Sequence, residues 1–235
     1  MNWRNFVIGL FAFGLAAAAG VNCAFAQARI GEAAVIQNEV VKVFDASATP
    51  VNVGDEVLRD ETMRTGNDSA ARLVMADSTN LSLGPNATLK LDRTVFNDEH
   101  SYRDIAVRLT SGAFRFVTGH SEKGAYKITT PLASIGVRGT ILDILSEPGR
   151  STVVLQEGAA AVCTLSFQCL QLTLPGDTAI ITATGGKTTI QKTTHSPWTF
   201  AATCAMTAGL CSVSRYADAS PVTPPPVDDA ALCGR

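Results

Sequence analysis

The chain has 235 residues and a formal net charge of −2, with 46% hydrophobic and 17% charged residues. This composition is typical of a folded domain and excludes a largely disordered chain. No basic cluster is interleaved with aromatic residues, which argues against a nucleic-acid partner, because such binding depends on neutralising phosphates.

The first 26 residues have the three parts of a secretory signal peptide. Arg4 supplies the positive charge, residues 6–19 form an apolar run, and residues 24–26 are a small-x-small cleavage site. We therefore expect cleavage after Ala26 and a periplasmic or secreted protein. An uncleaved anchor is the alternative, but the run is shorter than the roughly 20 apolar residues of a membrane span. We predict no membrane span after cleavage.

Between residues 29 and 190, short apolar alternations separated by turn residues predict an all-β domain. The turns include Ser111-Gly112 and Glu157-Gly158. Six residues are expected in the core, each contributing about 1.5 to 3 kcal/mol when buried: Leu81, Leu83, Phe114, Phe116, Ile135 and Val137. The candidate strands are 39–44, 71–75, 80–83, 88–91, 105–109, 113–117, 126–129, 134–144, 152–156, 160–164, 170–174 and 178–182.

The stretch 127–145, KITTPLASIGVRGTILDIL, is the most specific part of the sequence. Its alternating apolar residues predict a strand. Gly136 and Gly139 leave no Cβ on either side of Arg138, so backbone or another strand can approach closely. We expect Arg138 to be buried and paired with a carboxylate, because long charged residues rarely stay unpaired inside a sheet.

Together with residues 69–91 and 109–119, this stretch resembles the FecR domain, the extracytoplasmic β domain of iron-dicitrate-type signalling regulators. The three strings have the order and spacing of that family, and the resemblance is strongest over residues 38–158. It implies a twisted, solenoid-like β roll. It also implies that Gly136, Arg138, Gly139 and Thr140 are family-motif residues with mainly structural roles.

Full-length regulators of that family carry a cytoplasmic anti-sigma segment, a membrane span, this domain and a C-terminal part that docks on an outer-membrane transporter. The present sequence departs from that plan at both ends. We therefore expect a stand-alone exported member, and direct contact with a sigma factor is in doubt.

Five cysteines follow the expected cleavage site. Cys163 and Cys169 flank a short connection between two candidate strands, which brings their Cα atoms within bonding range. We expect this pair to be bonded, with a gain at the low end of about 2 to 4 kcal/mol because the closed loop is small.

Cys204 and Cys211 follow a predicted helix start at Ser196-Pro197-Trp198. An unbroken helix would hold them roughly 10.5 Å apart, too far to bond. Either Gly209 breaks the helix and the two cysteines bond, which we favour, or each has another partner. Cys233 is then left for intermolecular pairing.

No catalytic, cofactor-binding or metal-binding motif is found. The cysteine spacings differ from those of structural zinc sites, and an exported protein favours disulfides. The three histidines, His100, His120 and His195, belong to no ligand string. Asp143 and Glu147 could form a carboxylate pair, but the simplest role of Asp143 is to neutralise Arg138 or Arg115.

Four regions are thus predicted: a signal peptide (1–26), the β domain (27–194), a short helical, cysteine-containing segment (195–217) and a proline-rich disordered tail (218–235). The predicted function is a non-enzymatic binding or regulatory module in envelope signalling, whose partner is an envelope protein or glycan. A structural or scaffold component of the envelope is the alternative. Exposed strand edges would suit pairing with an extended partner segment.

Overall fold

The computed structural model describes residues 28–203, except 45–46, 99–100 and 123. They form fifteen strands and one short helix, α1 (Phe200–Thr203). The strands are β1 (Arg29–Gln37), β2 (Val40–Phe44), β3 (Ser47–Pro50), β4 (Glu56–Leu58), β5 (Thr62–Thr65), β6 (Ala70–Met75), β7 (Asn80–Leu83), β8 (Thr88–Asp98), β9 (Ser101–Val117), β10 (Tyr126–Thr129), β11 (Ala133–Glu147), β12 (Arg150–Thr164), β13 (Cys169–Leu172), β14 (Thr178–Thr184) and β15 (Lys187–Thr193).

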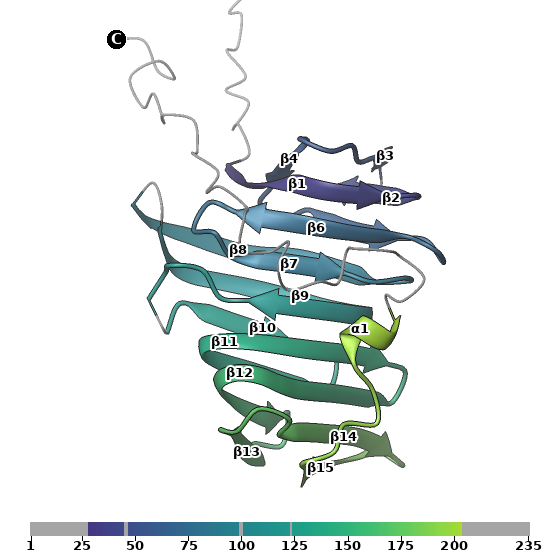
Figure 1. Ribbon diagram of the computed structural model, residues 1–235, viewed down its shortest axis with the longest axis vertical. Helices are drawn as coiled ribbons and strands as arrows, with labels where there is room; N and C mark the ends of the chain where they lie inside the picture. Colours follow the sequence, from purple (N-terminus) through teal and green to yellow (C-terminus); the bar gives the residue numbers. More distant parts are fainter. Residues whose placement is uncertain (1–27, 45–46, 99–100, 123, 204–235) are drawn as a thin grey trace, which may run out of the picture. The chain divides into compact units, whose positions relative to one another are not determined.

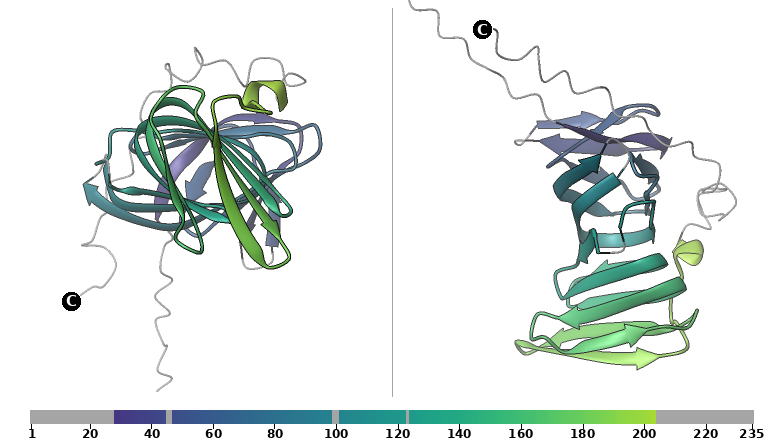
Figure 2. Two further views of the ribbon diagram at one scale, coloured as in Figure 1. Left: turned by 90° about the horizontal axis from the view of Figure 1, so that it is seen from below. Right: turned by 90° about the vertical axis from the view of Figure 1, so that its left-hand side faces the viewer.

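The strands belong to one sheet that folds into two layers, which we call layer 1 and layer 2 (Figures 1 and 2). Neighbours in layer 1 follow the order β4-β1-β6-β7-β9-β11-β12-β14-β15. Neighbours in layer 2 follow the order β3-β2-β5-β8-β9-β10-β11-β12-β13. Among the described strands, only the β9–β10 pair is parallel. The predicted all-β class is therefore confirmed.

Three long strands, β9, β11 and β12, pass from one layer to the other at a glycine. The first part of β9 pairs with β8 and β10, and the part after Gly112 pairs with β7 and β11. Gly112, Gly139 and Gly158 have φ values of 95°, 59° and 83°. Residues with a Cβ rarely adopt this backbone region, so glycine lets each strand bend sharply without ending.

The bends explain where the strand predictions were wrong. Ser111-Gly112 and Glu157-Gly158 were expected to separate strands, but each lies inside a continuous strand that changes layer. The predicted strands 80–83 and 126–129 agree with β7 and β10. Five further strands were not predicted: β3, β4 and β5 are short, β15 is rich in polar residues, and β1 has a register shift between Ala33 and Val35 that breaks its apolar alternation.

The hydrophobic core lies between the two layers. Phe116 of layer 1 meets Tyr126 of layer 2 edge to face, with ring centroids 5.7 Å apart. Ile135 and Val137 of layer 2 belong to the same cluster as Leu142 and Ile144 of layer 1. All six predicted core residues are buried.

The segment 194–203 returns to the outer face of layer 1, where α1 lies against β9 and β11 (Figure 1). Phe200 is buried there in a second, small apolar cluster with Ala113, Leu145 and Trp198. The predicted helix, with Ser196 as its N-cap and Pro197 in its first turn, starts three residues too early. The hydroxyl of Ser196 accepts a hydrogen bond from Trp198 N and closes a turn, and α1 begins at Phe200.

Several predictions concern residues outside the described part of the chain. They are the signal peptide, the proline-rich tail, most of the helical segment, and the pairing of Cys204, Cys211 and Cys233. All of them stay predictions. Within the described residues, no helix combines the length and the apolar character that a membrane crossing requires.

Candidate binding site

The motif residues of β11 alternate between the core and the outer face of layer 2. Ile135 and Val137 point into the core, and Gly136 and Arg138 are exposed. This alternation is the two-residue period of a strand. The motif thus provides both an inner packing surface and an outer, solvent-facing surface.

The expectation that Arg138 is buried and paired with a carboxylate is wrong. Arg138 is exposed on layer 2, whereas Asp143 is buried on the outer side of layer 1 and bonds Arg115. The reason is the bend at Gly139, which carries the two halves of β11 into different layers. Arg138 is therefore available to a ligand.

The expected close approach at Gly136 and Gly139 is also wrong. A Cβ added to either glycine would meet no atom within 4 Å. The crowded glycine is Gly158 on β12, whose added Cβ would lie 1.9 Å from the carbonyl oxygen of Gly139. The Gly136 position is instead open towards solvent, and Gly139 serves the bend.

Thr140 has the structural role that the motif implies. Its hydroxyl accepts a hydrogen bond from Arg138 N (2.8 Å) and donates one to Ala159 O (3.0 Å). Its backbone N donates to the hydroxyl of Thr118 at 2.7 Å. These bonds fix the bend of β11 against β9 and β12, and so hold the backbone that carries Arg138.

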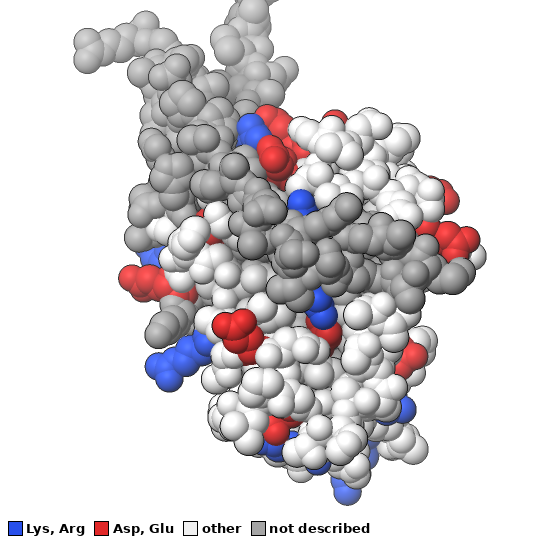
Figure 3. Space-filling model, viewed as in Figure 1, with Lys and Arg blue, Asp and Glu red and all other residues white. Residues whose placement is uncertain are grey.

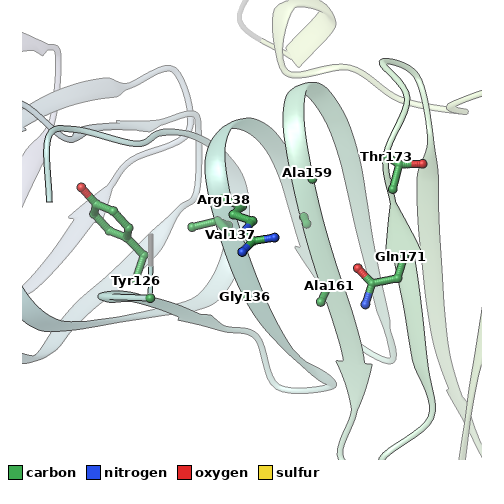
Figure 4. A pocket seen from close by; sticks show the side chains of 10 residues that line it. Tyr126, Gly136, Val137, Arg138, Ala159, Ala161, Gln171 and Thr173 are labelled. Atoms are coloured by element: carbon green, nitrogen blue, oxygen red, sulfur yellow. The ribbon is translucent and has the colours of Figure 1, made fainter. Parts of the chain in front are cut away.

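A shallow groove of about 470 Å³ crosses the outer face of layer 2 beside the motif. Small side chains from β11 and β12 form its floor, namely Gly136, Ala159 and Ala161, and Gln171 and Thr173 lie on its far side. Figure 4 shows Arg138 extending from β11 across this floor towards β12. The groove is therefore an uncharged floor with one guanidinium above it.

Tyr126 lines one side of the groove, but its hydroxyl is buried in a polar cluster around Asp77. The Asp77 carboxylate accepts hydrogen bonds from the hydroxyls of Tyr126 and Ser121, both at 2.6 Å, and from Thr79 N at 2.9 Å. Burial and, next, the Asp77 charge raise the pKa of Tyr126 to about 12. Tyr126 therefore stays neutral near pH 7 and offers no acid–base group to the groove.

Two cations beside the groove, Lys127 and Arg138, lack a carboxylate partner within the described residues, whereas Lys192, which donates to Gln171 O, is paired with Asp177. Lys127 lies next to Gly136 on the neighbouring strand, and neither Lys127 nor Arg138 is in an ion pair there. Elsewhere several charged side chains form ion pairs, such as Arg29 with Glu32, and Figure 3 shows acidic and basic side chains next to one another on one face. The groove is thus suited to a ligand that brings a carboxylate to Arg138.

The predicted disulfide between Cys163 and Cys169 is confirmed. It joins the paired ends of β12 and β13 with a Cα–Cα distance of 4.1 Å. We predict that neither cysteine reacts with iodoacetamide in the native oxidised protein, and that both react after reduction. Mass spectrometry of the tryptic peptides measures this, and labelling of both cysteines before reduction would contradict the disulfide.

The residues considered for catalysis are not brought together. Asp143 is fully buried with Arg115 and Glu147 is exposed. His120 and His195 are exposed, and His100 lies outside the described residues. Among residues 28–203, leaving out 45–46, 99–100 and 123, no group of three or more His, Cys, Asp or Glu side chains is arranged for a metal.

Two features of the site were missed from the sequence. Gly158 was seen only as a turn residue, although its approach to Gly139 fixes the bends of β11 and β12 together. Phe200 was not singled out, yet its ring covers the Arg115 guanidinium at 5.4 Å. The apolar alternation of β12 resumes after Gly158 with its phase shifted by one residue, from Val153 and Leu155 to Ala160 and Val162, and this shift is a signal that could have indicated the bend.

Comparison with known proteins identifies a family over less than half of the chain. Residues 61–161 match the family model described as FecR protein. A search of curated protein sequences returns no match. Two crystal structures of a protein described as a "putative anti-sigma factor" from Parabacteroides distasonis ATCC 8503 align with a TM-score of 0.47 and 18% identity. The alignments cover 57% of this chain and 59% of that one, less than two thirds of its length.

Proposed function

We propose that this protein, whose residues 61–161 match the FecR family model, is a non-enzymatic regulatory binding module that acts in envelope signalling. It binds a partner protein at the groove on layer 2. The observation that carries this proposal is Arg138, which is exposed and has no carboxylate partner among the described residues, above an uncharged floor of small residues. Arg138 belongs to the sequence motif that first indicated the family.

The groove favours an extended protein segment with an acidic residue. Gly136, Ala159 and Ala161 leave room for a main chain to lie close to the sheet. Arginine donates two parallel hydrogen bonds to a carboxylate, and such charge-assisted bonds are roughly twice as strong as neutral ones. Gln171 adds an amide that can donate to and accept from a peptide backbone.

Export to the periplasm or cell exterior is part of the proposal. The signal-like residues 1–26 support it. The Cys163–Cys169 disulfide supports it as well, because structural disulfides persist in oxidising compartments. A module in that location would transmit a signal by binding a protein that reaches or crosses a membrane.

Binding is favoured over catalysis by the chemistry of the groove. Its residues are Gly, Ala, Val, Tyr, Arg, Gln and Thr, and they include no carboxylate, histidine or cysteine that could act as a base or nucleophile. The one phenol, on Tyr126, is held in the Asp77 cluster. The absence of catalysis stays a prediction.

Replacing Arg138 with alanine tests the groove. We expect the free energy of unfolding to change by less than about 0.5 kcal/mol, because the side chain is exposed and unpaired. We expect partner affinity to fall by roughly 10- to 100-fold, since a hydrogen bond to a charged group contributes about 1.5 to 3 kcal/mol. Thermal denaturation and calorimetric titration measure the two effects.

The partner needed for this titration is captured with a photo-crosslinking amino acid at the exposed position Gln171 in the full-length chain. Arg150→Ala, at an exposed arginine that does not line the groove, is the matched control and should leave the affinity unchanged. Equal affinity for Arg138→Ala and Arg150→Ala would remove Arg138 from the interface. Capture of self-crosslinked or wall-associated species alone would support the scaffold alternative.

A further inference from the structure

The loop 164–168 presents two apolar side chains at the end of the β12–β13 hairpin. Phe167 is 89% exposed and Leu165 is 66% exposed. The Cys163–Cys169 disulfide closes this loop at its base. Side chains exposed to this extent contribute little to the core, so the fold itself does not explain why they are apolar.

The loop is held in one shape by its own hydrogen bonds. Thr164 N donates to Gln168 O at 2.9 Å and Phe167 N donates to Thr164 O at 3.0 Å. Gln168 N donates to the Thr164 hydroxyl at 3.1 Å, and that hydroxyl also bonds Ser166. A loop fixed in this way loses little further conformational freedom when it binds.

Phe167 has a backbone conformation that phenylalanine disfavours. Its φ is 62°, in the left-handed region that glycine and asparagine enter more easily. An asparagine at this position would adopt the left-handed conformation more easily, and no apolar ring would then be exposed to water. Strained backbone that is retained in this way clusters at binding sites.

The loop adjoins the groove. Cys169 pairs with Cys163, and two residues further along β13 Gln171 pairs with Ala161 on the groove floor. The loop and the groove therefore occupy neighbouring parts of the same hairpin. A protein bound in the groove can reach the loop at its end.

We propose that this loop is the apolar anchor of the interface, with Phe167 and Leu165 inserted into an uncharged apolar pocket of the partner protein. This inference rests on the proposed function of the groove. Aromatic side chains, phenylalanine included, are enriched in protein interfaces, and a few side chains that fill well-packed pockets supply most of the binding energy.

Charge and size decide between a protein and the other possible occupants. Residues 163–176 contain no charged side chain. Surfaces that bind anionic membranes usually combine apolar residues with several Lys or Arg, whereas this stretch has none and the neighbouring Lys192 is paired with Asp177. A second copy of the chain is disfavoured because neither of its two described pockets is uncharged: the groove carries Arg138, and the pocket beside Trp198 is only about 170 Å³ and carries Glu147 and Arg150.

Photo-crosslinking in cells tests the anchor, with benzoylphenylalanine placed separately at Phe167, Gln171 and Val53 of the full-length chain. Val53 is a matched control, an apolar loop residue that is 65% exposed and does not line the groove. We expect positions 167 and 171 to capture the same protein and position 53 not to capture it. The peptide crosslinked to position 167 should be apolar and uncharged.

The outcomes separate the anchor from the groove. Capture of the protein at position 171 but not at position 167 would contradict the proposed anchor and leave the proposed binding site in the groove unaffected. The same holds if position 167 captures only lipid or a second copy of the chain. Failure at both positions overturns both proposals. Equal capture of the same protein at position 53 overturns the anchor as a specific contact.

Phe167→Asn then gives the quantitative test with the captured protein after purification. Asparagine adopts the left-handed conformation readily, so the melting temperature should stay the same or rise while the ring is removed. We expect affinity to fall at least about 30-fold, the usual effect of losing an interface hot spot. Val53→Ser should leave affinity unchanged, and an unchanged affinity of Phe167→Asn overturns the proposal.

Discussion

Replacing Arg115 with alanine is expected to lower the free energy of unfolding by about 3 to 5 kcal/mol, the cost of leaving a buried charge without its partner. Arg115 Nε lies 2.6 Å from Asp143 Oδ1, and Arg115 Nη2 lies 2.9 Å from Oδ2. The two side chains are 7% and 0% exposed. The carboxylate would keep hydrogen bonds from Gln156 and from Phe200 N, but it would have no cation among the described residues.

Urea denaturation followed by circular dichroism measures the loss as a lower midpoint at unchanged slope. Arg108→Ala is the matched control, because Arg108 and Asp92 form an ion pair of similar length, 2.6 Å, with side chains 57% and 28% exposed. Exposed pairs of this kind contribute at most about 1 kcal/mol. Similar small losses for both variants would show that the Asp143 site is open to water.

A double replacement separates the strength of the pair from the cost of breaking it. Arg115→Met combined with Asp143→Leu removes both charges and keeps apolar volume beneath Phe200. Such replacements are often neutral or stabilising by about 1 to 4 kcal/mol. We expect this variant to be far more stable than Arg115→Ala, and equal losses would mean that Arg115 acts through packing alone.

The sequence was sufficient to predict the class, the core and most strands of the described domain. Alternation at Leu81, Leu83, Phe114 and Phe116 marks residues that face one core, whichever layer carries them. That pattern depends on the strand period, which is local. The layer to which each strand belongs cannot be predicted from neighbouring residues, because it depends on where the chain bends.

Arg138 shows why the candidate site was only partly predictable. The sequence placed the guanidinium inside a sheet and offered Asp143 as its partner, five residues along the same strand. The bend at Gly139 moves Asp143 to layer 1, beside Arg115, which comes from a strand far away in sequence. Which arginine pairs with Asp143 depends on how the strands pair in the folded chain, on either side of the bend. In the sequence, Arg138 and Arg115 looked equally suitable.

Replacing Gly158 with alanine is expected to be the most damaging change in the motif region. The added Cβ would lie 1.9 Å from Gly139 O and 2.8 Å from Gly139 C, both backbone atoms that cannot rotate aside. Alanine would also have to adopt a φ of 83°. A left-handed backbone costs roughly 1 to 2 kcal/mol and overpacking about 1 to 3 kcal/mol, so we expect a loss of about 2 to 5 kcal/mol.

Gly136→Ala, on the neighbouring strand, is the control that isolates this clash. No atom lies within 4 Å of its added Cβ, and its φ is not in the left-handed region. Alanine should therefore leave the unfolding free energy unchanged or raise it by about 0.5 to 1 kcal/mol, because glycine loses more conformational freedom in a strand. Thermal denaturation of the two variants side by side should separate them by several degrees. Equal melting temperatures would mean that the bends of β11 and β12 are free to move apart, and that Arg138 is not held in place above the groove.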